Sequence, residues 1–249
     1  MPVRTLEDAA AWVERVGLAL VFPREDVVLP SLWAAAGGEG EFAKRDESGK
    51  FLEWTAPMEF VWTTKDELPA RGLACAGKHL RGRASLVSFE LLPALAAVVR
   101  RDDLDPLEGE IVDLLREQGP LSTRELPDLL PAYERKRVRA AIDRLQKALV
   151  VTNAGLEETA GWPAIVVDLV DRRYGDRLRG LQADEARARI ARHVLATVGE
   201  LTAEDLRGAL GWRKRDAAAA LEATGAASYD GGGFTVWTRA SAGAARRAR

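Results

Sequence analysis

The chain is poor in the residues on which most metal and redox sites depend. Its 249 residues include one cysteine, Cys75, and two histidines, His79 and His193. A single cysteine cannot form an internal disulfide, and neither histidine has a second ligand at the spacing of a zinc site. We therefore expect no metal and no other cofactor.

The sequence also lacks the motifs of the common nucleotide enzymes and of membrane proteins. It contains no P-loop, no G-x-G-x-x-G and no G-x-S-x-G, so no residues support an NTPase, dinucleotide-binding or hydrolase function. No run approaches the roughly 18 apolar residues of a membrane span. The first ten residues hold no hydrophobic segment of a secretion signal. We expect a globular, cytoplasmic protein of bacterial type without membrane contact.

Positive charge is not in excess, because the formal net charge is −2. A dedicated nucleic-acid-binding protein is usually basic. The charges are uneven, however: residues 101–130 hold nine acidic and three basic residues, whereas residues 131–150 hold six basic and two acidic ones. Because DNA affinity depends on the local potential, a local basic stripe can bind DNA even in an acidic protein.

That stripe belongs to a segment, Pro106–Leu156, whose pattern predicts a winged helix-turn-helix. A first helix with an apolar face ends at Gly119-Pro120. Ser122 and Glu125 form a capping box at the start of a short second helix. A basic third helix follows over 134–147, and such a unit places its third helix in a DNA major groove.

The wing of this unit is expected directly after the third helix. The apolar pair Val150-Val151 predicts one strand, Asn153-Ala154-Gly155 a turn, and Leu156 the return. An apolar pattern over Trp162–Leu178 then predicts a linker helix.

The basic third helix is the first candidate DNA-binding element. Its cations are Arg135, Lys136, Arg137, Arg139, Arg144 and Lys147. Outward-facing guanidinium groups can pair with phosphates or contact guanine with two hydrogen bonds. The structural alternative is a basic amphipathic helix that only solvates a core face or pairs with the acidic segment 101–130.

Residues 184–238 repeat the same plan with a weaker signal. A long helix, a capped short helix from Thr202, a third helix opened by Arg213, Lys214 and Arg215, and a hairpin turning at Asp230–Gly233 follow in order. Four alanines after Asp216 offer little to base edges, so a structural or dimerising module is an equal alternative to DNA binding.

The N-terminal residues 1–103 carry a third candidate, a basic loop over Gly77–Arg83. Lys78 and Arg81 belong to a group of basic residues that could bind a phosphate. The favoured alternative is a surface turn between two strands. In the same region we expect a strand pair over Phe51–Trp62 and an apolar helix over Leu86–Val99.

The expected fold is mainly α with small β-hairpins (α+β), with tandem winged helix-turn-helix domains after an N-terminal α/β domain. The expected divisions are 1–103, the first winged helix 106–160, a linker helix 161–183, the second winged helix 184–238 and a basic tail 239–249.

This layout resembles the AlkZ-like family, bacterial winged-helix DNA glycosylases that repair alkylated and crosslinked DNA. The resemblance rests on the run from Gly17 to Pro23, GLALVFP, and on the tandem winged helices. In the family the equivalent run reads G-x-x-Q-x-D-P or carries a Q-x-Q variant, whose polar residues act on a water beside the glycosidic bond. Here Leu20 and Phe22 occupy those positions, and neither can accept a proton. The resemblance therefore implies the scaffold and the association with DNA, but not the glycosylase chemistry.

The sequence thus favours a non-catalytic protein that binds double-stranded DNA in repair or damage response, associated with the nucleoid. One alternative is an active glycosylase that uses Asp26 or Glu25 as its carboxylate. Another is a protein-interaction scaffold or transcription regulator, which the overall acidic balance favours. In each case a protein partner is possible.

Overall fold

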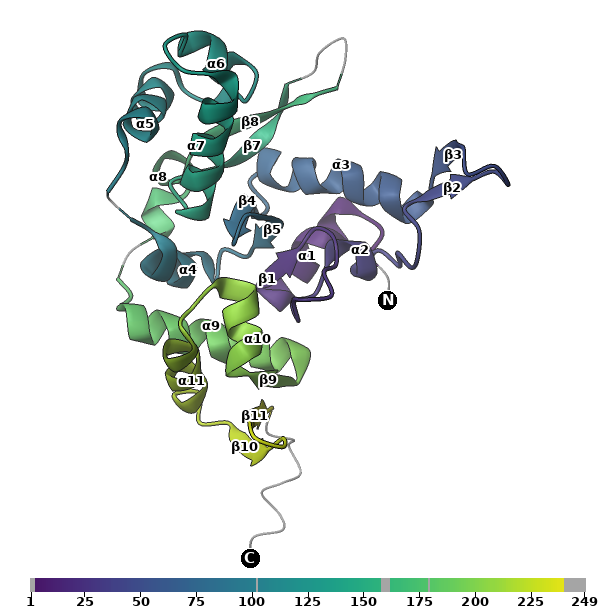
Figure 1. Ribbon diagram of the computed structural model, residues 1–249, viewed down its shortest axis with the longest axis vertical. Helices are drawn as coiled ribbons and strands as arrows, with labels where there is room; N and C mark the ends of the chain where they lie inside the picture. The colour runs from purple at the N-terminus through teal and green to yellow at the C-terminus, as the bar shows by residue number, and fades with distance from the viewer. Residues whose placement is uncertain (1–2, 102, 158–161, 179, 240–249) are drawn as a thin grey trace, which may run out of the picture.

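The computed structural model describes residues 3–101, 103–157, 162–178 and 180–239, and in them helices are mixed with four small antiparallel sheets. Figure 1 shows a central β-hairpin, β4 (Cys75–Leu80) and β5 (Arg83–Val87), with other elements on three sides of it. None of the described helices has the length and apolar character needed to span a membrane. The mixed helix and strand content agrees with the expected α+β class. Residues 240–249 of the predicted tail lie outside the described residues.

The N-terminal part is built on a three-stranded sheet in the order β1-β5-β4. Its other elements are α1 (Leu6–Val16), β1 (Leu18–Leu20), α2 (Leu32–Ala35), β2 (Ala43–Arg45), β3 (Phe51–Trp54), α3 (Ala56–Ala70) and α4 (Leu92–Val99). The hairpin β2–β3 projects away from the rest of the molecule in Figure 1. A capping box between Thr5 and Asp8 starts α1, as the sequence indicates.

Gly17 ends α1 because the packing there leaves no room for a side chain. Its φ is +74°, and a Cβ at this position would lie 2.6 Å from both the His193 ring and Leu91. The chain therefore turns directly from α1 into the buried strand β1.

Two expectations for this part are corrected and one is confirmed. The strand pair expected over Phe51–Trp62 is wrong beyond Trp54, because α3 begins at Ala56 with Pro57 in its first turn and β3 pairs with β2 instead. The turn between two strands favoured for Gly77–Arg83 is confirmed as a tight hairpin of β4 and β5 around Arg81 and Gly82. The helix expected from Leu86 begins only at Leu92, because Leu86 and Val87 belong to β5.

The first helical unit follows, with elements in the predicted order. They are α5 (Pro106–Gln118), β6 (Leu121–Ser122), α6 (Glu125–Leu129), α7 (Arg135–Lys147), β7 (Val151–Glu157) and β8 (Ala164–Leu169). The reciprocal contacts expected at Ser122 are present: the Glu125 N–H donates to Ser122 Oγ at 3.1 Å, and the Ser122 N–H donates to Glu125 Oε2 at 2.8 Å. Gly119 ends α5, as predicted.

The predicted turn at Asn153-Ala154-Gly155 is wrong, because β7 continues through it to Glu157 with a bulge. Gly155 serves a close approach rather than a turn: its φ is +143°, and a Cβ there would lie 3.3 Å from the Ala70 side chain of α3. The return strand is β8, which pairs with both β6 and β7.

The linker helix predicted over Trp162–Leu178 is also wrong, because the strand β8 occupies the first half of that segment. Residues 164–169, which include the β-branched run Ile165-Val166-Val167, form the central strand of this sheet. Only α8 (Val170–Tyr174) and a 3₁₀ turn, η1 (Gly175–Arg177), are helical in the rest of that segment.

The second helical unit repeats the order of the first. Its elements are α9 (Ala183–Val198), β9 (Glu200–Thr202), α10 (Ala203–Leu210), α11 (Lys214–Glu222), β10 (Ala227–Asp230) and β11 (Thr235–Thr238). The predicted hairpin turn is present, since Asp230 Oδ1 accepts the N–H groups of Gly232 and Gly233, each at 2.9 Å.

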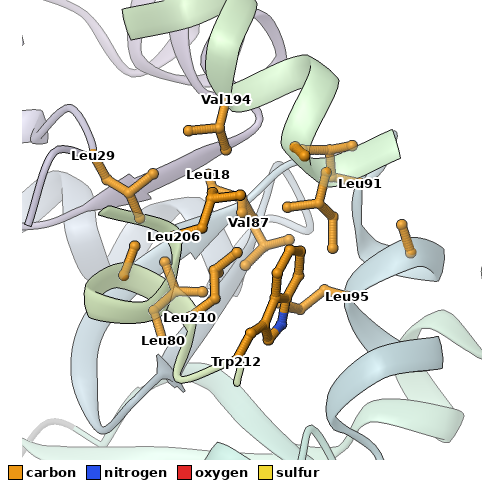
Figure 2. Packing of buried hydrophobic residues seen from close by; sticks show 14 of the residues in the cluster. Leu18, Leu29, Leu80, Val87, Leu91, Leu95, Val194, Leu206, Leu210 and Trp212 are labelled. Atoms are coloured by element: carbon orange, nitrogen blue, oxygen red, sulfur yellow. The ribbon is translucent and has the colours of Figure 1, made fainter. Parts of the chain in front are cut away.

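The two units differ in how they are buried. The first has a core of its own, formed by side chains of α5, α6, α7 and its sheet. The second shares its core with the N-terminal sheet and α4: Figure 2 shows Leu206, Leu210 and Trp212 packed against Leu80 and Val87. The second unit is therefore anchored by apolar contacts with the N-terminal part.

The first unit is joined to β4 mainly through buried polar groups. His79 Nδ1 lies 2.7 Å from the Gln146 carbonyl oxygen at the end of α7. A carbonyl only accepts, so Nδ1 carries the proton and Nε2 accepts from the Cys75 thiol, 3.5 Å away. The Thr152 hydroxyl of β7 donates to the Ala76 carbonyl at 2.8 Å. Burial raises the pKa of Cys75 to about 12, so the thiol stays protonated.

We predict that this junction makes stability depend on pH. Burial lowers the pKa of His79 to about 4, from 6.5 when exposed. The folded state then resists protonation, so stability is full above about pH 6.5 and falls as the pH falls towards 4. The loss approaches about 3 kcal/mol over this range. Urea unfolding between pH 7.5 and 5 measures it.

The matched variants are His79→Gln and His193→Gln. The first should remove most of this pH dependence, and the second should retain it. A wild-type free energy of unfolding that stays constant from pH 7 to pH 5 would contradict the prediction.

Candidate nucleic-acid interface

The basic helix predicted over 134–147 is α7, and its two faces separate as expected. Val138, Ala141, Ile142 and Leu145 are buried in the core of the first unit. The cations predicted on this helix are all exposed. Their surroundings divide them into three groups.

The cations at the start of α7 have neighbours within the first unit. Arg135 forms an ion pair with Asp128 of α6. The guanidinium carbon of Arg137 lies 5.7 Å from the centre of the Tyr133 ring, and the Tyr133 hydroxyl donates to Glu110 at 2.6 Å. Arg135 and Arg137 are exposed, and surface pairs of this kind exchange readily for other anions.

Lys136 and Arg139 form the second group. Within the described part of the chain neither has an ion pair or a side-chain hydrogen bond. They lie three residues apart, so both project from the same side of α7. An uncompensated pair of cations on an exposed helix face is available to an anionic ligand.

The cations at the end of α7 hold the fold together. Arg144 Nε donates at 2.6 Å to Glu108, a carboxylate that is fully buried, and Arg144 Nη2 donates to Asp105 at 2.7 Å. The stem of Lys147 packs on the β4–β5 turn, where a Cβ on Gly82 would lie 2.6 Å from Lys147 Cε. The sequence predicts both as DNA-binding residues. Arg144 is engaged by protein carboxylates, whereas the Lys147 ammonium has no ion pair or hydrogen bond within the described residues and stays a candidate.

A groove of about 470 Å³ lies beside α7 and brings together residues from distant parts of the sequence. It is lined by Lys78 of β4, Arg124, Arg139, Asp143, Gln146 and the segment Trp162–Ile165, among others. Lys78 Nζ donates to both Asp143 carboxylate oxygens, at 2.7 and 2.8 Å. Three cations therefore face one carboxylate, which leaves the groove positive.

Two residues of this groove were missed from the sequence. Arg124 was assigned only to the start of a helix, and Trp162 to a linker helix. The available signal for Trp162 was its position beside Pro163, which is more typical of a loop than of a helix interior.

The other predicted loop cation, Arg81, lies elsewhere. Its Nη1 donates to the carbonyls of Arg207 and Gly208 at 3.3 and 3.0 Å, and Arg83 donates to Gly208 at 3.2 Å. Both carbonyls lie in the last turn of α10, where cations are favoured. Arg81 thus links the central hairpin to the second unit.

The candidates of the second unit are more dispersed. Arg213 precedes α11, Arg215 pairs with Asp216 at 3.3 Å, and Lys214 lines a separate cleft of about 700 Å³ with Glu204 and Phe234. Of the four alanines that follow on α11, Ala217 and Ala220 are buried and only Ala219 is exposed. No arrangement comparable to the groove beside α7 is formed by these three cations.

The segment expected to hold the family's chemistry is largely buried. Leu20 is 1% exposed, and Phe22 packs edge-on against Phe42 at 5.4 Å. Asp26, the alternative carboxylate, is exposed and hydrogen-bonded to Arg24 at 3.1 Å and to Arg83 at 3.0 Å. Arg24 and then Arg83 lower the pKa of Asp26, which makes it a weaker base. Among the described residues no group of His, Cys, Asp or Glu is arranged to hold a metal.

Comparison with known proteins agrees with this architecture. A family model described as AlkZ related matches residues 3–211. The chain belongs to the AlkZ-related family. Among solved structures, the Streptomyces sahachiroi DNA glycosylase AlkZ is similar, with a TM-score of 0.57 and 15% sequence identity. No match was found among curated proteins.

The similarity to that glycosylase concerns the fold. It covers 95% of this chain but 65% of the other, so this member of the AlkZ-related family spans about two thirds of that glycosylase. The resemblance stated from the GLALVFP run and the tandem units is confirmed at the level of the family.

We predict that replacing Arg144 destabilises the protein. Arg144→Ala removes one partner of the buried Glu108 carboxylate, which keeps Arg101. The expected loss is about 1–3 kcal/mol in the free energy of unfolding. Arg116→Ala is the control, because it removes a surface pair with Asp113 and should cost less than about 1 kcal/mol. Equal effects of the two variants in urea unfolding would rule out a structural role for Arg144.

Proposed function

We propose that this chain binds double-stranded DNA through α7 and the adjoining groove, and acts in DNA repair or damage response without glycosylase chemistry of its own. The observation that carries the proposal is the pair Lys136 and Arg139, two uncompensated cations on the exposed face of α7 beside a positive groove. Phosphates are the ligands that such a surface attracts.

The proposal includes two winged helices, Pro106–Leu169 and Ala183–Thr238, after an N-terminal domain that ends near residue 103. Its support is the repeated order of helix, short strand, two helices and hairpin. In such a unit the third helix contacts the major groove. The third helix is α7 in the first unit and α11 in the second. We place the end of the first winged helix beyond residue 160 because β8 pairs with both other strands of its sheet.

The distribution of acidic residues favours DNA over a protein-interaction scaffold. The acidic segment 101–130 contacts α7 at its two ends, through Asp128 at Arg135 and through Asp105 and Glu108 at Arg144. Between these contacts, Lys136 and Arg139 on the exposed face of the first half of α7 have no acidic partner among the described residues. If the cations of α7 served only to neutralise the acidic segment, acidic side chains would pair with them along the whole helix.

We propose the lack of glycosylase activity because the residues at the expected catalytic positions cannot act as a general base. Leu20 and Phe22 offer no proton acceptor, and both oxygens of Asp26 are engaged by arginines. A general base needs an available oxygen within hydrogen-bond distance of the attacking water.

We predict that duplex binding is salt-dependent and that Lys136→Ala with Arg139→Ala weakens it. Two lost phosphate contacts should reduce the slope of log K against log salt by about 1.8. Fluorescence anisotropy of a labelled duplex between 50 and 200 mM salt measures both slope and affinity. Arg4→Ala with Arg116→Ala is the control of equal charge, since both side chains are exposed and neither is on α7.

Two outcomes would contradict this proposal. One is no duplex binding by the wild type at low salt. The other is an equal loss in both double variants, which would attribute binding to net charge alone.

We further predict no base release from alkylated or crosslinked duplex. The measurement is strand cleavage at abasic sites after incubation with the wild type and with a Glu25→Gln, Asp26→Asn variant. Release by the wild type would replace the non-catalytic proposal with the glycosylase alternative. Its loss in the variant would then assign the chemistry to Glu25 or Asp26.

A further inference from the structure

The groove beside α7 has an aromatic rim that duplex binding does not explain. Trp162 is 73% exposed, more than any other large apolar side chain among the described residues. It lies immediately before β8, and Arg124 donates to its carbonyl at 2.9 Å. Its backbone is therefore tied to the start of α6.

A second tryptophan stands beside it from a different element. The ring of Trp62, on α3, lies 6.3 Å from that of Trp162 in an edge-to-face arrangement. Lys65 Nζ lies 4.4 Å from the centre of the Trp62 ring. Trp62 is itself 43% exposed, so the pair forms a surface feature and not a part of the core.

The cations of the groove share its lining with Trp162. Trp162 lines the same groove as Lys78, Arg124 and Arg139. An exposed indole face next to several cations is the combination that single-stranded nucleic-acid sites use, in which bases stack on aromatic rings and cations follow the backbone. The groove volume lies in the range of about 300–1,000 Å³ common for small-ligand pockets.

We propose that Trp162 stacks on an unpaired nucleobase, one extruded from a duplex or next to a strand opening, while Arg124 and Arg139 hold the flanking phosphates. This inference rests on the proposed DNA binding and adds the state of the DNA that is recognised. In an intact duplex both faces of each base are covered by its neighbours, so a tryptophan at a groove rim has no base face to contact. An unpaired base presents one.

Three labelled DNAs test the proposal: a matched duplex, the same duplex with one bulged thymidine, and the same bulge carrying an abasic spacer. The two bulged duplexes carry the same charge, so a difference between them reports on the base alone. The wild type should bind the thymidine bulge about five- to a hundredfold more tightly than the abasic bulge. Trp162→Ala should abolish that difference. Trp162→Phe should keep most of it, and Trp54→Ala, an exposed tryptophan on β3, should keep all of it.

The outcomes separate this inference from the proposed function. Equal wild-type binding of the two bulges overturns base stacking but leaves duplex binding intact. Base stacking is also overturned if Trp162→Ala keeps the wild-type stability towards urea but loses affinity for all three DNAs equally. No binding of the matched duplex by any variant contradicts DNA binding by α7 itself. Capture of a protein through Trp162, with no preference for the thymidine bulge, would assign the surface to a protein partner instead.

Discussion

The β4–β5 hairpin is the constraint on which the rest of the structure depends, because it contacts both helical units. On one side His79, Ala76 and the Lys78 backbone bond to the end of α7 and to β7. At its turn Arg81 and Arg83 cap the carbonyl end of α10. Most of β4 is buried, so the polar groups that it presents to the first unit must be satisfied by partners. Their pairing, together with Leu149 in the shared core, places the first unit relative to the N-terminal part. Apolar packing and the two arginines place the second unit.

This constraint decides which cations remain available for a ligand. Arg81 and Arg144 are cations like Lys136 and Arg139, but they are engaged by carbonyl groups and by a buried carboxylate. A basic stripe in a sequence therefore overstates the positive charge that the surface offers to DNA. The available charge lies on the exposed face of α7 and in the adjoining groove, where cations from β4, α6 and α7 come together.

The chain shares the fold of the AlkZ-related family but differs from the pattern stated above in the GLALVFP run. In the GLALVFP run, Leu20 is part of the shared core and Phe22 packs on Phe42. Apolar side chains at these positions contribute burial in place of polar groups that would need water and partners. The groove beside α7 lies on a different part of the fold, so binding there does not depend on that run.

The sequence by itself determined the helix starts that a local capping signal marks. Capping boxes at Thr5, Asp105 and Thr202 are formed within one turn, so local chemistry specifies them, and the order of the second unit followed from the same signals. Only the tertiary structure decided the wing of the first unit and the composition of the groove. Gly155 looked like a turn because its close neighbour, Ala70, is far away in the sequence. Trp162 lines the same groove as Lys78 because β8 pairs between β6 and β7, and pairing between distant strands leaves no local pattern.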